Sequence, residues 1–205
     1  MGKVIQALPP GAINEALPAA CASGLLGGTD LTTQSGAICA GACPAGELCP
    51  TPATVQTSLC PAGSACPAQS SVPLPCLAGS WSNVTGLTST EHCRPCPPGN
   101  ACGAGSIYPA PCSAGTFADT QGLALCHKCV AGKFQTNTGS TACEDCSADS
   151  FCPEGAAVAL PCGAGTFSNA TNLISQPQCL WCPGGTFCAP GSDCLLYTSP
   201  SPRDS

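Results

Sequence analysis

Charge and aromatic rings are scarce in this chain. Only 8% of its 205 residues are charged and 4% are aromatic, and it contains two histidines. Binding of nucleic-acid phosphates needs grouped lysine or arginine, so the scattered basic residues argue against a nucleic-acid partner. So few aromatics also leave little material for the hydrophobic core of an ordinary domain. The basic residues are Lys3, Arg94, Lys128, Lys133 and Arg203.

Long apolar runs are missing as well. No stretch approaches the roughly 18 continuous apolar residues of a membrane-spanning helix, so we expect no membrane span in this chain. Residues 1–20 lack the apolar run of about 7–15 residues that marks a secretory signal peptide. They also carry no myristoylation motif, since Gln6 stands where Ser or Thr is required. We interpret residues 1–20 as a linker or an incomplete N-terminal region.

Cysteine, glycine and proline are abundant instead. The chain has 21 cysteines, 24 glycines and 22 prolines. Cysteine at this level marks a disulfide scaffold in an extracellular chain. Cross-links then supply the stability that a small apolar core does not. We therefore expect the chain to lie outside the cell or at its surface, and we expect no cofactor.

The cysteines open a short repeat, C-x-x-G-x-Φ, in which Φ is apolar. Glycine at the fourth place allows a positive φ and hence a tight turn; only Asp149 departs from it. We expect Φ to turn inward beside the cysteine pair of its own module. The openers, which number the modules 1 to 10, are Cys21, Cys43, Cys60, Cys76, Cys96, Cys112, Cys129, Cys146, Cys162 and Cys182. The Φ residues are Leu26, Leu48, Ala65, Trp81, Ala101, Phe117, Phe134, Phe151, Phe167 and Phe187.

The modules have two lengths. In the short form the closing cysteine comes directly after Φ. In the long form 13 to 17 residues lie between the opening and the closing cysteine. Pro and Gly between modules suppress long helices and ladders. The sequence therefore predicts a small disulfide-rich fold, an elongated array of short β-hairpin and irregular modules with little regular secondary structure. Short modules close at Cys49, Cys66, Cys102, Cys152 and Cys188, and long ones at Cys39, Cys93, Cys126, Cys143 and Cys179.

The module count bears on disulfide connectivity. Two long modules stand in tandem between Cys112 and Cys146, where neighbouring repeats hold one, so an insertion adds two cysteines at once. This favours bonds closed within each module, while interleaved pairing between adjacent modules stays open. The predicted bonds are 21–39, 43–49, 60–66, 76–93, 96–102, 112–126, 129–143, 146–152, 162–179 and 182–188.

The run from Cys112-Ser-Ala-Gly-Thr-Phe117 to Cys126-His-Lys-Cys129 resembles the ephrin-receptor-like cysteine-rich repeats of protist, algal and animal surface proteins. The long module is also similar to the first sub-module of tumour necrosis factor receptor repeats, which closes on its own cysteine pair. The resemblance extends from Cys60 to about Gly191 and loosely over 21–49. It implies a non-catalytic stalk, adhesive or ligand-binding ectodomain, with an extracellular protein or glycan as its ligand. The short modules depart from the receptor pattern, so a cytokine ligand is not carried over.

A zinc-binding module is the main alternative. Cys126, Cys129, Cys143 and Cys146 read C-x2-C-x13-C-x2-C, close to the spacing of a zinc ribbon. Two long modules in tandem generate the same spacing without a metal.

A thiol–disulfide exchange enzyme is the second alternative. The pairs Cys93/Cys96 and Cys126/Cys129 form CxxC motifs with a basic residue between them. Redox CxxC pairs gain reactivity at a helix N-terminus in a βαβ context, which the surrounding sequence does not predict. His92 and His127 lack the partners of nucleophilic catalysis.

An acidic group surrounds module 8. Glu144, Asp145, Asp149 and Glu154 lack the spacing of a calcium loop. We expect them to form a solvated acidic surface.

Two N-x-[ST] triplets predict N-glycosylation at Asn83 and Asn169. Each asparagine stands seven residues after the opener of a long module, so we expect both on an exposed limb of the longer loop. The alternative is that Asn and Thr are kept for hydrogen bonds within a polar turn.

The repeat pattern divides the chain. We predict divergent modules over 21–59, a repeat over 60–111, a repeat with an extra module over 112–161 and a truncated repeat over 162–193. One choice of codons for Cys194–Asp204 resembles a transposase-type sequencing adapter, and the next opener is expected at position 198, where Thr198 stands. We interpret 194–205 as an adapter-derived tail and leave Cys194 out of the disulfide set.

Overall fold

The structure is a computed structural model that describes residues 22–27, 41–51, 54, 56–191 and 195–196. The chain forms two compact units. Unit 1 runs to Cys96 and includes Cys102–Pro109, and unit 2 consists of Pro97–Ala101 and the residues from Ala110 onward. Module 5 therefore contributes to both units, and each unit is described by itself.

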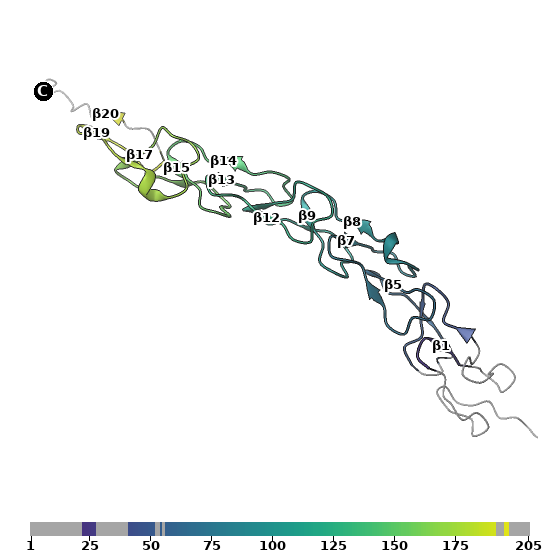
Figure 1. The fold of residues 1–205 in the computed structure, drawn as a ribbon. Helices are drawn as coiled ribbons and strands as arrows, with labels where there is room; N and C mark the ends of the chain where they lie inside the picture. Colours follow the sequence, from purple (N-terminus) through teal and green to yellow (C-terminus); the bar gives the residue numbers. More distant parts are fainter. Residues whose placement is uncertain (1–21, 28–40, 52–53, 55, 192–194, 197–205) are drawn as a thin grey trace, which may run out of the picture. The chain divides into compact units, whose positions relative to one another are not determined.

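Each described module forms one two-stranded antiparallel hairpin (Figure 1). The first strand is Φ with the residue before it, and the second strand is the pair of residues that follows the module's loop. Because each strand has only two residues, the hairpins cannot bury a sheet face of their own. The pairs are β1 (Leu25–Leu26) with β2 (Gly41–Ala42), β3 (Glu47–Leu48) with β4 (Ser58–Leu59), β5 (Ser64–Ala65) with β6 (Leu74–Pro75), β7 (Ser80–Trp81) with β8 (Arg94–Pro95), β9 (Asn100–Ala101) with β10 (Ala110–Pro111), β11 (Thr116–Phe117) with β12 (His127–Lys128), β13 (Lys133–Phe134) with β14 (Glu144–Asp145), β15 (Ser150–Phe151) with β16 (Leu160–Pro161), β17 (Thr166–Phe167) with β18 (Leu180–Trp181), and β19 (Thr186–Phe187) with β20 (Leu195–Leu196).

Helix is confined to two short 3₁₀ turns in the described residues, η2 (Thr90–His92) and η3 (Gln176–Gln178). Each lies just before the closing cysteine of a long module and starts after a serine cap. Among the described residues, no helix is long and apolar enough to cross a membrane. The predicted small disulfide-rich fold with little regular secondary structure is confirmed.

The turn after each opener is joined to the next module by backbone hydrogen bonds. We call the fourth residue of a module, usually glycine, the first-glycine position. At Gly115, the carbonyl accepts from the N–H of Cys129 (2.9 Å) and the N–H donates to the carbonyl of Gln135 (2.7 Å). The same two bonds recur along the described modules, so each turn is held by the module that follows it.

A second positive-φ position recurs in every loop from module 3 onward, six or seven residues after the first-glycine position. At all of these positions except Gly122, the N–H donates to the carbonyl of the opening cysteine of the preceding module, as Gly139 does to Cys112 (2.8 Å). Sequence analysis missed this second-glycine position, although its regular spacing from the first was a readable signal. The residues there are Gln69, Gly86, Gly105, Gly122, Gly139, Gly155, Asn172 and Gly191.

Contacts extend beyond adjacent modules. A Cβ added at Gly115 would lie 2.2 Å from the carbonyl oxygen of Gly155, two modules further on. A Cβ added at Gly63 would likewise lie 2.4 Å from the carbonyl oxygen of Gly105. Two backbones can approach this closely only where no side chain intervenes. The first-glycine residues of modules 1 to 3 and 5 to 7 therefore do two things: they allow the turn, and they leave room for the carbonyl of a second-glycine position.

Disulfides, not aromatic rings, form the fully buried core. Most described cysteines are completely buried, whereas Phe117, Phe134 and Phe151 are half-buried. The expected inward turn of Φ beside the cysteines of its own module leaves out contacts with the next module. Phe134 packs against Cys146 and Cys152 of the next module. The reason is a parallel bridge from Φ to the loop of the following module, such as Phe134 to Ala156.

Candidate functional site

Disulfides close each described module on itself. Nine bonds are described, and they are those that within-module pairing predicts, while the predicted bond 21–39 lies outside the described residues. The cysteines are joined as 43–49, 60–66, 76–93, 96–102, 112–126, 129–143, 146–152, 162–179 and 182–188.

The four cysteines of the zinc alternative are all oxidised. Cys126 is bonded to Cys112, Cys129 to Cys143, and Cys146 to Cys152. A disulfide sulfur is not the thiolate that zinc requires. In the described part of the chain, no group of three or more His, Cys, Asp or Glu side chains is placed to hold a metal ion. The spacing that suggested zinc arises from two long modules in tandem.

The two cysteines of each CxxC motif have different partners. Between Cys126 and Cys129 lies the exposed strand β12, and between Cys93 and Cys96 lies β8. Residues three apart on an extended strand point to opposite faces, so these pairs do not meet. The strand also lacks the helix N-terminus that lowers a redox thiol's pKa. The exchange alternative therefore has no geometric support at these motifs.

Disulfide mapping in solution distinguishes within-module disulfides from a zinc site. We expect proteolysis under non-reducing conditions, followed by mass spectrometry, to show Cys112–Cys126, Cys129–Cys143 and Cys146–Cys152 linkages. We expect metal analysis of the same sample to show far less than one zinc per chain. One zinc per chain together with four alkylatable thiols among Cys126, Cys129, Cys143 and Cys146 would contradict this pairing.

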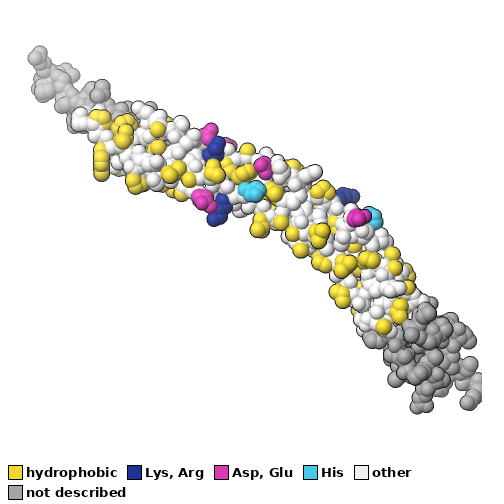
Figure 2. Space-filling view, in the orientation of Figure 1, with side chains coloured by type: hydrophobic (Ala, Val, Ile, Leu, Met, Phe, Trp, Pro, Cys, Tyr) yellow, Lys and Arg dark blue, Asp and Glu magenta, His cyan; other side chains and the backbone are white. Residues whose placement is uncertain are grey.

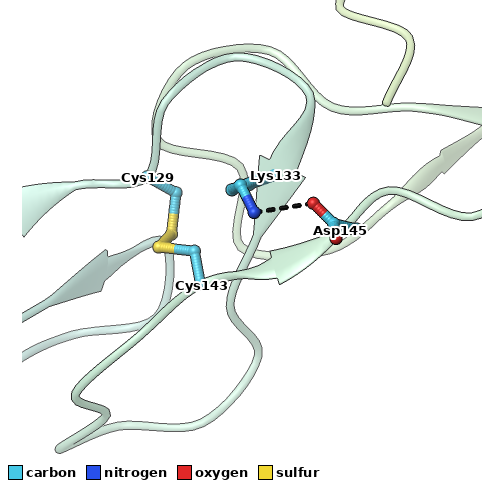
Figure 3. A network of polar contacts seen from close by, with 4 residues as sticks. All are labelled: Cys129, Lys133, Cys143 and Asp145. Carbon is cyan, nitrogen blue, oxygen red and sulfur yellow. Dashed lines mark hydrogen bonds and ion pairs between the residues drawn. A yellow bond between two sulfur atoms is a disulfide. The ribbon is translucent and has the colours of Figure 1, made fainter. Parts of the chain in front are cut away.

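The acidic residues around module 8 have separate roles. Asp145 Oδ1 accepts from Lys133 Nζ at 2.6 Å across hairpin β13–β14, beside the Cys129–Cys143 bond (Figure 3). Glu154 lies 3.7 Å from Lys128. Both ion pairs are exposed and each contributes little to stability.

Asp149 is not part of a solvated acidic surface, which corrects the sequence expectation. It is 6% exposed and takes the first-glycine position with φ +57°. Its carboxylate accepts from the N–H of Ser168 at 2.8 Å, and its own N–H donates to the Ser168 carbonyl. Asp tolerates positive φ better than most residues with a side chain, and this hydrogen bond satisfies the buried carboxylate.

The two histidines have no catalytic partners among the described residues. His92 is exposed in η2, with Nδ1 at 3.5 Å from Thr88 Oγ1. His127 is exposed on β12, with its ring centroid 5.7 Å from that of Phe117. His127 therefore lies against an apolar surface.

That surface belongs to a groove in unit 2, which we call the module 6–8 groove. It joins three open hollows of about 630, 350 and 340 Å³. Phe117 and Val130 line the first two hollows, and the segment Thr141–Cys143 lines the second and third. Apolar and charged residues line these hollows together; the charged ones are Lys128, Lys133, Asp119, Glu144 and Glu154.

Charge is concentrated around this groove. Seven of the ten charged residues in the described part of the chain lie between Asp119 and Glu154. Figure 2 shows both signs gathered over this region, with a smaller group near β8 and a largely uncharged surface elsewhere on the visible face. The module inserted at Cys129 contributes both Val130 and Lys133 to the groove. The extra module therefore supplies both an apolar and a charged residue of the module 6–8 groove.

The predicted glycosylation residues are separate from this groove. Asn83 and Asn169 are exposed, each directly after a buried serine that follows Φ. They belong to the long modules 4 and 9.

Comparison with known families supports the resemblance drawn from the sequence. Residues 115–159 match the family described as tyrosine-protein kinase ephrin type A/B receptor-like. The match covers about a fifth of the chain and includes every residue that lines the module 6–8 groove. No curated protein matches the chain. The similarity to ephrin-receptor-like cysteine-rich repeats is thus confirmed for modules 6 to 8.

Proposed function

We propose that this region is a non-catalytic extracellular array that acts as a stalk and presents a binding surface. The observation that carries the proposal is the module-to-module bonding: the turns of modules 1 to 9 each donate to and accept from the module that follows. Units that each contact only close neighbours in sequence build a quasi-one-dimensional array. The disulfides and the ephrin-receptor-like match are consistent with an extracellular ectodomain.

Cysteine chemistry supports a structural role. No cysteine among the described residues is free. Disulfides persist in oxidising compartments outside the cytosol, which favours an extracellular or cell-surface location. A chain whose sulfurs are used as cross-links has no thiolate nucleophile in those modules, and this favours a role other than catalysis.

Within this function, the module 6–8 groove is the surface best suited to a partner protein. The apolar lining residues Phe117 and Val130 can contact an apolar side chain of the partner. The mixed charges of the lining favour a partner with complementary charges, since charges across an interface steer association and fix register. Such a surface combines apolar and charged residues, as ordinary protein interfaces do.

Small-angle scattering tests the stalk. A compact chain of 205 residues has a radius of gyration of about 17 Å. We expect the oxidised chain to exceed this value clearly and to give a distance distribution with a long tail, because the bonding pattern links each module to those next in sequence. The reduced and alkylated chain provides the control for an unfolded coil. A radius near 17 Å for the oxidised chain would contradict the stalk.

A further inference from the structure

The two N-x-T triplets occupy the same structural position. In modules 4 and 9, Φ is followed by Ser-Asn-x-Thr. Ser82 is 4% exposed and Ser168 is 3% exposed, and each Oγ accepts from the backbone N–H two residues later at 3.1 Å. In a serine turn of this kind, the side chain of the serine itself holds the backbone that follows it. The buried serine therefore sets the conformation in which the asparagine is presented.

The asparagine and threonine side chains point into solvent. Asn83, Thr85, Asn169 and Thr171 are all exposed. None of these side chains makes a hydrogen bond with the residues that the structure describes. The turn therefore does not need them, which removes the alternative that Asn and Thr are kept for local hydrogen bonding.

A third long module forms a similar turn without a glycan acceptor. In module 7, Gln135 Oε1 accepts from the N–H of Asn137 at 2.9 Å, and Thr136 takes the place of the asparagine. Gln135 is buried like the two serines. The turn thus forms in module 7 without an acceptor triplet, and the Asn–Thr pair is an addition to it in modules 4 and 9.

We propose that Asn83 and Asn169 are both N-glycosylated. The donor is a polyprenyl-diphosphate-linked oligosaccharide of the secretory pathway. A bond forms between asparagine Nδ2 and the sugar C1, the diphosphate leaves with the bonding electrons, and Nδ2 loses one proton. The proposal rests on the extracellular location in the proposed function. Modules 6 to 8 contain no N-x-[ST] acceptor, so the groove-forming modules stay unmodified.

The test expresses the full chain behind a secretory signal peptide in a eukaryotic host and treats it with peptide-N-glycosidase. We expect two glycosidase-sensitive mass steps in the parent chain, one step in N83Q or N169Q, and none in the double variant. Thr85→Ala should also remove the step at Asn83, while the conservative Thr85→Ser should retain it.

Thiol counting on the same samples separates this proposal from the function it rests on. Secreted chain with its disulfides formed but without a glycosidase-sensitive step would overturn the glycan proposal and leave the extracellular array intact. Retained chain with free thiols and no glycan would overturn both. Equal steps in Thr85→Ala and Thr85→Ser would also contradict acceptor recognition at Asn83.

Discussion

Reduction of the disulfides is expected to unfold both units at neutral pH and room temperature. The fully buried core consists largely of cysteines, and the hairpins have two residues per strand. In the chain-entropy model, closing loops of this length contributes roughly 2–3 kcal/mol per bond. Even a discounted total over the described bonds exceeds the net stability of about 5–15 kcal/mol of an ordinary domain. Nothing else in the described modules replaces that contribution.

Hydrogen exchange provides the measurement for this prediction. Amides that bond between modules, such as Cys129 N–H to the Gly115 carbonyl, should be protected in the oxidised chain and unprotected after reduction and alkylation. Alkylating reagent without reductant is the control and should change nothing. Persistent protection of these amides in the fully reduced chain would show that packing alone holds the modules.

Gly115→Ala is expected to destabilise its module strongly, although it adds only one methyl group. The new Cβ would lie 2.2 Å from the carbonyl oxygen of Gly155. The residue also has φ +81°, and a left-handed conformation costs a residue with a side chain roughly 1–2 kcal/mol. Overpacking against backbone adds about 1–3 kcal/mol. A decrease of about 3 kcal/mol in the free energy of local opening corresponds to roughly a hundredfold faster hydrogen exchange at the Cys129 amide.

Gly165→Ala is the matched control. Gly165 has φ +79°, and a Cβ there would meet nothing within 4 Å. Only the backbone strain applies, so exchange at Cys182 N–H, which donates to Gly165, should rise about tenfold. Equal effects of the two substitutions would mean that strain alone matters and that the approach of Gly155 does not.

Local features of this fold were predictable because they depend on short stretches of chain. An opener, a glycine three residues later and Φ two residues after that predict a turn and the start of a hairpin. Pairing of cysteines within modules followed from the insertion of whole modules, since a bond confined to one module moves with it. The exposure of Asn83 and Asn169 was likewise expected from their place in the longer loops.

Contacts between modules were decided by the tertiary structure. The packing of Phe134 on the next module's cysteines, the second-glycine position, and the approach of Gly155 to Gly115 depend on how successive hairpins stack. No single module contains that information. Asp149 shows the same limit: its sequence neighbours indicate a solvated acid, but its partner Ser168 is supplied by the following module.

Composition and cysteine spacing thus determined the module, its turn and the class of fold, because these are set by chain geometry within about 20 residues. Cys126, Cys129, Cys143 and Cys146 could be zinc ligands or disulfide partners on spacing alone, because both uses need the same sulfur atoms. The tertiary structure decided between them: Cys126 and Cys129 flank the two-residue strand β12 and are bonded to different partners, Cys112 and Cys143. The groove, too, required the tertiary structure, because Phe117, Val130 and Glu154 come from three different modules and meet only when those modules stack.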